Sequence, residues 1–293
     1  MNSNNDPHCP RIGLTGSHGV LGRSLRQYCT SFEWFPFPGD IRQLSEIQSW
    51  LESAGQLDAV FHLAAMVPTQ RVEESPPQAL RTNVEGTCNL LEAVRTKTAA
   101  TARPWLFISS SSHIYASNNQ LLREDSPVAP VTLYGLTKHQ AEQWALAYQT
   151  AFKLPVCIGR IFSYTSRWQP PSYFIPSLIG RISQSLPNAV LKIPGLHGSR
   201  DFVTTKQISQ AVQVLFEKRA TGIFNIGSGK CYPLLDIAHA IQRRLGRMDV
   251  QIIALDTGTT HLVADVSKLA QTGLVLASQL DELLDEVLEP HSA

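Results

Sequence analysis

The stretch RIGLTGSHGVLG, from Arg11 to Gly22, joins a short apolar run to a turn with glycine at every third position. The run suits a buried parallel strand, and the following RSLRQYC, residues 23–29, suits a helix. In such a turn Gly16 would permit the sharp bend, Gly19 would let a pyrophosphate approach the backbone, and Gly22 would let the helix pack on the strand. The helix N-terminus would add amide donors and positive charge. A strand, a glycine turn and a helix in this order predict a dinucleotide site in a Rossmann-type α/β fold.

Length and composition limit the classes of protein that the chain can be. Its 293 residues are 43% hydrophobic, enough for a large α/β domain, alone or with a smaller lobe. The net charge of +1 provides no basic field for nucleic acid. The five cysteines form no CxxC pair or zinc pattern, so we expect no metal site and a reducing compartment. The polar start MNSNNDPHCPR and the lack of an apolar run of about 20 residues predict a soluble, cytoplasmic protein that does not bind a membrane.

The segment after the first helix bears on which dinucleotide binds. Residues 33–37, EWFPF, are predicted as the second strand. Many Rossmann proteins carry an acidic residue at the end of this strand to bind the ribose 2′-hydroxyl, but here the strand ends in Phe37. Asp40 follows, and it either faces the adenine edge or caps the turn before the helical segment 41–51. Arg23 and Arg42 could bind a 2′-phosphate, so the choice between NAD and NADP stays open.

Three further segments continue the alternation of strands and helices. Residues 59–67, AVFHLAAMV, are predicted as a buried strand whose end places small side chains beside the cofactor, with His62 packed or hydrogen-bonded within it. A helix is predicted from near Asn83 to Lys97, with Asn83 as its cap. The strand that starts at Trp105 runs into four serines, residues 109–112. The serines fall at a carboxyl strand end, where ligands bind in an open α/β sheet.

A tyrosine and a lysine stand four residues apart in LYGLTKHQAEQWALAYQTAF, residues 133–152. The segment is predicted as an amphipathic helix, with apolar positions at Leu133, Leu136, Ala141, Trp144, Ala145 and Tyr148. Residues i and i+4 share a helix face, so Tyr134 and Lys138 would point into the same space. A nearby ammonium lowers a tyrosine pKa from about 10 toward the range of a general acid or base. An ordinary surface pair is the alternative.

These motifs together resemble the extended short-chain dehydrogenase/reductase family, in its NAD-dependent epimerase/dehydratase type, which modifies nucleotide sugars. The resemblance rests on nine stretches in the family's order over nearly the whole chain: TGSHGVLG (15–22), GDIR (39–42), HLAA (62–65), NVEGTCNLLEA (83–93), FISSSSHIY (107–115), YGLTK (134–138), RIFS (160–163), RDFV (200–203) and FNIGSGK (224–230). It implies a doubly wound parallel sheet with a smaller C-terminal α/β lobe that binds the substrate.

The resemblance also implies roles for individual residues. Tyr134 would be the general acid or base, Lys138 would lower its pKa and hold the nicotinamide ribose, and Ser111 would bind the reacting oxygen; these three are the expected catalytic residues. The positions expected to contact NAD or NADP are Gly16, His18, Gly19, Val20, Leu21, Gly22, Asp40, Ile41, Leu63, Ala64, Ala65, Asn83, Ser109 and Phe162. The positions expected to contact a nucleotide sugar are Val67, His113, Ser163 and Arg200.

Departures from the family's patterns narrow the expected reaction. The 4,6-dehydratase branch carries Asp-Glu after its catalytic threonine, where this chain has Ser112 and His113, so dehydration is not expected. The short chain is similar to the 4-keto reductases, including those of GDP-linked 6-deoxyhexoses. We therefore expect an NAD(P)H-dependent oxidoreductase that reduces a nucleotide-linked 4-keto-6-deoxy sugar at carbon 4, with Tyr134 as proton donor. A nucleotide-sugar 4-epimerase with tightly bound NAD and a non-catalytic dinucleotide-binding protein are the alternatives.

The second half of the chain is predicted as a less regular lobe. Prolines interrupt the alternation of strand and helix beyond residue 160. We expect residues 1–160 to form the dinucleotide-binding domain and 161–293 mainly the substrate lobe, with about 200–228 returning to the sheet. Segments 205–216 and 234–245 are predicted as helices. Arg200 is expected to bind the diphosphate of the substrate, which needs cationic donors.

The resemblance further implies a homodimer. Family members often pair through two helices, which here are expected in residues 83–97 and 134–152. Leu90, Leu91 and Trp144 could serve that contact or the core of the protomer equally well.

Overall fold

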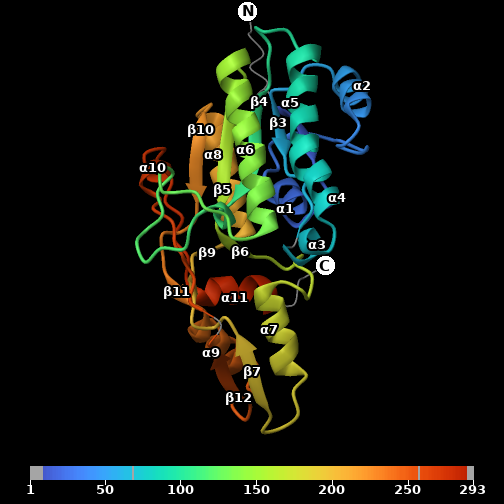
Figure 1. Cartoon of the computed structure of the whole chain (residues 1–293). Coiled ribbons are helices and arrows are strands. Elements are labelled where there is room, and N and C mark those ends of the chain that lie inside the picture. The colour runs from blue at the N-terminus through green and yellow to red at the C-terminus, as the bar shows by residue number, and fades with distance from the viewer. Residues whose placement is uncertain (1–8, 68, 257, 289–293) are drawn as a thin grey trace, which may run out of the picture. The chain divides into compact units, whose positions relative to one another are not determined.

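The computed structural model describes residues 9–67, 69–256 and 258–288, and Figure 1 shows its helices and strands. The chain forms two compact units. The first comprises Met1–Ser110, Thr132–Gly159 and Ser209–Ile223, and the second comprises Ser111–Val131, Arg160–Ile208 and Phe224–Ala293. The segment MNSNNDPH, which entered the expectation of a cytoplasmic protein, lies outside the described residues.

A six-stranded sheet carries its strands in the order β10-β5-β4-β3-β1-β2. Their bounds are β1 Arg11–Thr15, β2 Glu33–Pro36, β3 Ala59–His62, β4 Trp105–Ser111, β5 Val156–Ile161 and β10 Gly222–Ile226. β1 pairs in parallel with β2 on one side and with β3 on the other, and β3 pairs in parallel with β4. The strand order therefore reverses between β1 and β3, which is the switch point at which doubly wound sheets bind ligands. The predicted Rossmann-type fold is confirmed.

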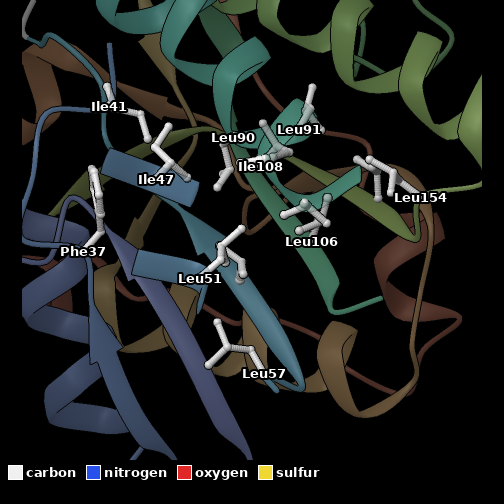
Figure 2. Close-up of a cluster of buried hydrophobic side chains, with 14 of the residues drawn as sticks. Phe37, Ile41, Ile47, Leu51, Leu57, Leu90, Leu91, Leu106, Ile108 and Leu154 are labelled. Atoms are coloured by element: carbon white, nitrogen blue, oxygen red, sulfur yellow. The ribbon is translucent and has the colours of Figure 1, made fainter. Parts of the chain in front are cut away.

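Alternation along the strands buries two different faces of the sheet. Val60 of β3 and Leu106 of β4 are fully buried in the cluster of Figure 2, where they pack with helices α2 (Leu44–Ala54) and α5 (Gly86–Lys97). The next residue along β3, Phe61, points to the opposite face, as strand geometry requires. Its ring centroid lies within 6.2 Å of those of Trp105, Phe107 and Phe216. The core of the first unit thus has an aliphatic layer and an aromatic layer.

Most elements expected in the first unit are confirmed, although several boundaries differ from the expected ones. Helices α1 (Val20–Tyr28) and α6 (Leu133–Phe152) form where the sequence predicts them. The expectation that the third strand continues to residue 67 is wrong, because β3 ends at His62 and residue 63 onward connects it to α3 (Thr69–Glu74). In that connection Leu63 N still donates to Thr15 O of β1, but beyond Leu63 the backbone bonds to side chains, as at Met66 N, which donates to Asn83 Oδ1 at 2.6 Å.

Asn83 does not cap a helix, contrary to expectation. The helical stretch begins earlier, at α4 (Pro76–Leu80), and continues through a π-helical turn (Arg81–Glu85) into α5. Asn83 lies in the middle of that turn and is only 1% exposed. A π turn shifts the following helix by one residue and is found most often at functional sites. Here it turns the Asn83 side chain inward, away from the backbone amides that a cap would bind.

Helix α6 carries two apolar faces instead of the single one expected. Ala141 and Ala145 are 1% and 0% exposed and belong to the core. Leu136 and Trp144, which the periodicity places on the same face, are 41% and 49% exposed. Leu90 and Leu91 of α5 are both 0% exposed, so they serve the core and not a contact surface.

The second unit is built from small sheets and helices. β6 (Ser163–Thr165) pairs in parallel with β9 (Phe202–Thr204), and β7 (Val190–Pro194) with β12 (Gln251–Leu255). β11 (Tyr232–Pro233), β8 (Ser199–Arg200) and β13 (His261–Leu262) form a third sheet. The helices are α7 (Phe174–Ser183), α9 (Leu234–Arg244), α10 (Ser267–Ala270) and α11 (Leu280–Leu288). The predicted helices at 205–216 and 234–245 are confirmed as α8 (Thr205–Glu217) and α9.

A buried carboxylate organises the glycine turn of the second unit. Asp201 is 0% exposed. Its oxygens accept hydrogen bonds from the backbone amides of Ser228, Gly229 and Ala264 at 2.8, 2.8 and 3.2 Å, and from the Ser228 hydroxyl at 2.6 Å. A Cβ on Gly227 would come within 2.5 Å of the same carboxylate. The amides of this turn are therefore bound within the protein, unlike those of a turn that holds phosphate.

Across the described residues, no helix combines the length and the apolar character that crossing a bilayer requires. The same residues contain no group of three or more His, Cys, Asp and Glu side chains arranged to hold a metal ion.

Candidate active site

The three glycines of the first turn meet different constraints. Gly16 has a φ of +74°, and a Cβ there would lie 2.7 Å from Ala64 N. A Cβ on Gly22 would lie 2.3 Å from Gly16 O and 2.8 Å from Ser17 Cα. Gly19 is exposed, and a Cβ on it would meet only Gly16 O, at 3.3 Å. The packing of the chain itself thus excludes side chains at Gly16 and Gly22, whereas the space beside Gly19 is open to a ligand.

The N-terminus of α1 lies at this turn. Gly19 is its N-cap and has no side chain to bind the amides of the first helical turn, and that turn holds no acidic residue. Such an end attracts an anion through its amides and its dipole. His18 is exposed next to Gly19, while Val20 and Leu21 are half-buried in the first turn. These residues, together with the open side of Gly19, fit the pyrophosphate of a dinucleotide.

Asp40 and Arg42 form a pair beyond β2. The Arg42 guanidinium donates to both carboxylate oxygens of Asp40, with Nε at 2.9 Å from each. These hydrogen bonds lower the pKa of Asp40. The Asp40 carboxylate also accepts from the Arg42 amide at 3.0 Å, so it closes a turn, and α2 begins later, after Gln43. Ile41 is buried against α5, where a Cβ on Gly86 would come within 2.7 Å of it.

The connection after β3 lies across the switch point from β1. Ala64 N donates to Thr15 Oγ1 at 3.3 Å, and Leu63 N donates to Thr15 O at 3.2 Å. Leu63, Ala64, Ala65 and Val67 are all half-buried. The Asn83 side chain holds the same connection, through Met66 N, and also donates to Thr137 Oγ1 at 3.0 Å. Five predicted cofactor or substrate positions of the first unit are thereby placed around one loop.

His62 is a hydrogen-bonded strand residue, as expected. Its Nδ1 lies 2.7 Å from Thr15 Oγ1, and its Nε2 lies 3.0 Å from Thr87 Oγ1. Burial, and then the nearby charge of Lys138, lower the pKa of His62 to about 3. The imidazole is therefore neutral at physiological pH.

Helix α6 presents Tyr134 and Lys138 from its first turns. Thr132 caps the helix by accepting from Gly135 N at 3.1 Å. Tyr134 is half-buried, whereas Lys138 is only 5% exposed. Burial lowers the pKa of Lys138 to about 8, against the opposing charge of Glu142 one turn later. Because about 8 is still above physiological pH, the structure keeps a buried ammonium one helical turn from the Tyr134 phenol, which suits proton transfer.

Ser111 is the last residue of β4. Its hydroxyl accepts from His113 N at 3.2 Å and so caps the short 3₁₀ turn Ser112–Ile114. Ser109, two residues earlier, is 7% exposed. Between them, the buried Ser110 Oγ has no hydrogen-bond partner among the residues that the structure describes. An unpaired buried hydroxyl at a carboxyl strand end is in keeping with a ligand there.

The second unit brings His113 and Arg200 near each other. Burial, and then the charge of Arg200, lower the pKa of His113 to about 4. Arg200 donates to Ser199 O at 2.9 Å and to Thr260 O and Oγ1 at 2.8 and 2.7 Å. Thr260 stands sixty residues from Arg200. No local sequence pattern links the two residues, so their contact could not be predicted.

The remaining predicted positions of the second unit are Phe162 and Ser163. The Phe162 side chain is 2% exposed and packs with Tyr115, at 6.1 Å between ring centroids. Ser163 is half-buried in β6. Tyr115 is itself held by Arg160, which donates to its hydroxyl at 2.9 Å, and donates onward to Asn225 Oδ1 at 2.7 Å. This support for the turn at 112–114 was also missed by sequence reasoning.

Comparison with known proteins adds to this geometry. A sequence model of the NAD dependent epimerase/dehydratase family matches residues 12–227. GDP-6-deoxy-D-mannose reductase from Pseudomonas aeruginosa is 27% identical over 236 residues, which make up 75% of this chain and 75% of the relative. UDP-glucuronate 4-epimerase 2 from Arabidopsis thaliana is 26% identical over 234 residues, which make up 72% of this chain but only 52% of that relative, so the match spans about half of its length.

Among solved structures, RMD from Pseudomonas aeruginosa complexed with NADPH has a TM-score of 0.85. It is 20% identical, and the match covers 95% of this chain and 97% of that one. At this identity the likeness shows the shared fold.

Replacing Gly19 by alanine tests whether the open space beside this residue holds the pyrophosphate. Gly19→Ala should fold normally, because its φ of −72° suits alanine, yet weaken NAD(P)H binding by roughly tenfold, since the methyl occupies the approach of the pyrophosphate. Fluorescence titration with NADH and NADPH measures the affinity. Gly180→Ala, in a helix where a Cβ meets nothing within 4 Å, is the matched control. Unchanged affinity in Gly19→Ala would place the dinucleotide elsewhere.

The buried ammonium predicts an alkaline limit on dinucleotide binding. Because the pKa of Lys138 is lowered to about 8, its charge is present below that pH and is lost above it. Affinity for NAD(P)H should therefore fall above pH 8, by up to about tenfold per pH unit. The Lys138→Met variant should bind NAD(P)H more weakly at pH 7, and its affinity should not fall further above pH 8. A flat profile to pH 9.5 in the unmodified protein would show that this charge does not contribute to binding.

Proposed function

The chain belongs to the NAD dependent epimerase/dehydratase family, and from this premise we propose that it reduces a nucleotide-linked 4-keto-6-deoxy sugar at carbon 4. It is an NAD(P)-dependent oxidoreductase of the extended short-chain dehydrogenase/reductase type. The observation that carries the proposal is the buried Lys138 ammonium one helical turn after Tyr134 at the start of α6. The similarity to GDP-6-deoxy-D-mannose reductase supports the choice of a keto sugar as substrate.

Bound NAD(P)H supplies the hydride for carbon 4. Tyr134 donates its phenolic proton to the oxygen of the same carbonyl as charge develops on it, and the Lys138 ammonium stabilises the phenolate that is left. The Ser111 hydroxyl accepts from His113 N, which leaves its proton to be donated to the reacting oxygen. The phenolate then regains a proton from solvent. The ketone thus becomes a secondary alcohol, with one hydride from the dinucleotide and one proton from Tyr134.

We assign the substrate's diphosphate to Arg200 and its sugar to the neighbourhood of His113. Thr260 holds the Arg200 guanidinium by two hydrogen bonds, so the charge is fixed in place before an anion arrives. His113, with a pKa of about 4, is neutral at physiological pH and can share hydrogen bonds with sugar hydroxyls. Val67 and Ser163 are proposed as further substrate contacts, by their match to the family's motifs.

The cofactor positions expected from the sequence remain part of the proposal. Gly16, Gly19 and Gly22 form the turn, and Leu63, Ala64, Ala65 and Asn83 line the facing loop. Asp40, paired with Arg42 in the turn after β2, is proposed to face the adenine edge of the dinucleotide. Either NAD or NADP is compatible with this pair.

A nucleotide-sugar 4-epimerase is the second candidate. The similarity to UDP-glucuronate 4-epimerase 2 favours it. It would use Tyr134 and Lys138 in the same way, but would return the hydride to the sugar and keep NAD bound.

We also propose a homodimer that pairs through α6. Trp144, Tyr148 and Phe152 follow each other at four-residue spacing, with ring centroids 6.5 and 5.1 Å apart. Trp144 is 49% and Phe152 is 39% exposed. Tyr148 between them is half-buried. Exposed aromatic side chains on one helix, such as Trp144 and Phe152, are typical of a contact surface. None of the five cysteines, all of them within the described residues, forms a disulfide, and we propose a reducing compartment such as the cytoplasm.

Tyr134→Phe tests the proposed reaction. Loss of the phenolic proton should lower turnover by about a hundredfold or more, while NAD(P)H still binds. The assay is the loss of reduced-nicotinamide absorbance with a panel of GDP-, dTDP- and UDP-linked 4-keto-6-deoxy sugars. Tyr148→Phe is the matched control, since Tyr148 lies on the same helix as Tyr134 and its hydroxyl donates to Glu92 of α5 at 3.1 Å. The reductase proposal is contradicted if the unmodified protein consumes no NAD(P)H with any sugar of the panel. If it also releases bound NAD on denaturation, 4-epimerase becomes the proposed function.

Light scattering on Trp144→Glu tests the homodimer. A carboxylate in the aromatic row should turn a dimer into a monomer, because pairing would bury an unpaired charge. Leu186→Glu, at a residue of the second unit that is 78% exposed, should leave the dimer intact. A dimer that survives Trp144→Glu, or a monomeric unmodified protein, contradicts the proposed contact.

A further inference from the structure

A continuous chain of buried hydrogen bonds runs from the first glycine turn to helix α5. Ala64 N donates to Thr15 Oγ1 at 3.3 Å, Thr15 Oγ1 lies 2.7 Å from His62 Nδ1, and His62 Nε2 lies 3.0 Å from Thr87 Oγ1. Thr87 Oγ1 then donates to Asn83 O at 2.7 Å. Thr15, His62, Asn83 and Thr87 are each 2% exposed or less.

The acceptors along the chain fix the position of every proton. A threonine hydroxyl has one proton, and that of Thr87 goes to Asn83 O, so Thr87 must accept from His62 Nε2–H. His62 Nδ1 then has no proton and accepts from the Thr15 hydroxyl, which in turn accepts from Ala64 N. His62 is thus a neutral Nε2–H imidazole that accepts on one side and donates on the other.

The far end of the chain reaches the catalytic helix. The backbone carbonyl of Asn83 accepts the hydrogen bond from Thr87, and the Asn83 side chain donates to Thr137 Oγ1 at 3.0 Å. Thr137 Oγ1 donates to Tyr134 O at 2.9 Å. The same Asn83 side chain accepts from Met66 N, in the loop whose Ala64 begins the chain. One network of hydrogen bonds therefore connects the loop beside Gly16 to the turn of α6 that carries Tyr134.

The surroundings of His62 require it to stay neutral. The charge of Lys138 acts on it, and burial also disfavours the charged imidazole. A protonated His62 would place two positive charges together in the core, and its Nδ1–H would oppose the Thr15 hydroxyl.

We propose that His62 is a positioning residue that couples the dinucleotide turn at Thr15–Gly16 to the segment of α6 that carries Tyr134. The inference rests on the proposed roles of Tyr134 and Lys138. It adds that the positions of the glycine turn and of the start of α6 depend on each other. A structural change at the turn alters α6 through the hydrogen bonds of Thr15, His62, Thr87, Asn83 and Thr137. Among the described residues, no hydrogen bond joins Thr15 to Thr137 directly, so the coupling depends on this path.

A double-mutant cycle measures the coupling. Thr15→Val and Thr137→Val each remove one end of the chain at nearly constant volume. The readout is the dissociation constant of NADPH, which needs no sugar substrate, so the result does not depend on the reaction proposed above. The double variant should depart from the product of the single effects by about threefold or more. In a His62→Gln background, whose amide can bond Thr87 but offers Thr15 no imidazole nitrogen, the effects should multiply independently.

Two outcomes would overturn the coupling. Independent effects of Thr15→Val and Thr137→Val in the unmodified background would reduce His62 to a packing residue. An interaction of the same size in the His62→Gln background would show that coupling takes another path. Thr98→Val is the matched control, because Thr98, the C-cap of the helix that carries Thr87, donates from Oγ1 to Val94 O at 2.7 Å but lies outside the hydrogen-bond chain. It should not couple to Thr15→Val.

The tautomer of His62 gives a test that needs no variant to fold well. Nitrogen-15 spectra of histidine-labelled protein should show one neutral Nε2–H imidazole that does not titrate between pH 5 and 8, assigned by its absence in His62→Gln. A neutral Nδ1–H form, or titration within that range, would break the direction of the chain and with it the proposal.

Discussion

The interaction on which this site depends is the burial of the Lys138 ammonium. A charged group removed from water is costly unless its surroundings compensate, and here the compensation is arranged around one turn of α6. Glu142, also fully buried, opposes the charge from the next turn, and burial still lowers the pKa of Lys138 to about 8. The other polar groups of the site must therefore be compatible with a fixed positive charge. His62 is the clearest example, because burial and the charge of Lys138 keep it neutral while it bonds two threonines.

The topology explains why these groups meet. The strand order reverses between β1 and β3, so the glycine turn after β1 and the loop after β3 lie side by side at one edge of the sheet. The close approach of Gly16 to Ala64 makes that edge compact. The π-helical turn at Asn83 then lets one side chain reach both the loop and Thr137 of α6. The parts that would hold a dinucleotide and the helix that carries Tyr134 belong to one unit.

The sequence predicts these parts to the extent that they are local. The strand, glycine turn and helix of residues 11–28 follow from apolar runs and glycine spacing, and Tyr134 and Lys138 follow from their separation by one helical turn. The expected cap at Asn83 is wrong because the residue lies in a π turn, which leaves no sequence pattern. The hydrogen bonds of His62 to Thr87 and of Arg200 to Thr260 join residues that are distant in sequence. Local patterns in one sequence cannot predict such contacts. Helix α6 was assigned one apolar face because periodicity does not distinguish a core stripe from an exposed one.

The most direct test of reduction at carbon 4 follows the hydride itself. NADPH or NADH carrying deuterium at the transferable position of its nicotinamide would be incubated with the protein and a nucleotide-linked 4-keto-6-deoxy sugar. The product would then be analysed by mass spectrometry and proton NMR. The account predicts that the sugar gains one deuterium, located at carbon 4, in step with oxidation of the dinucleotide. A sugar that changes configuration without gaining deuterium, while the added dinucleotide stays reduced, would contradict it.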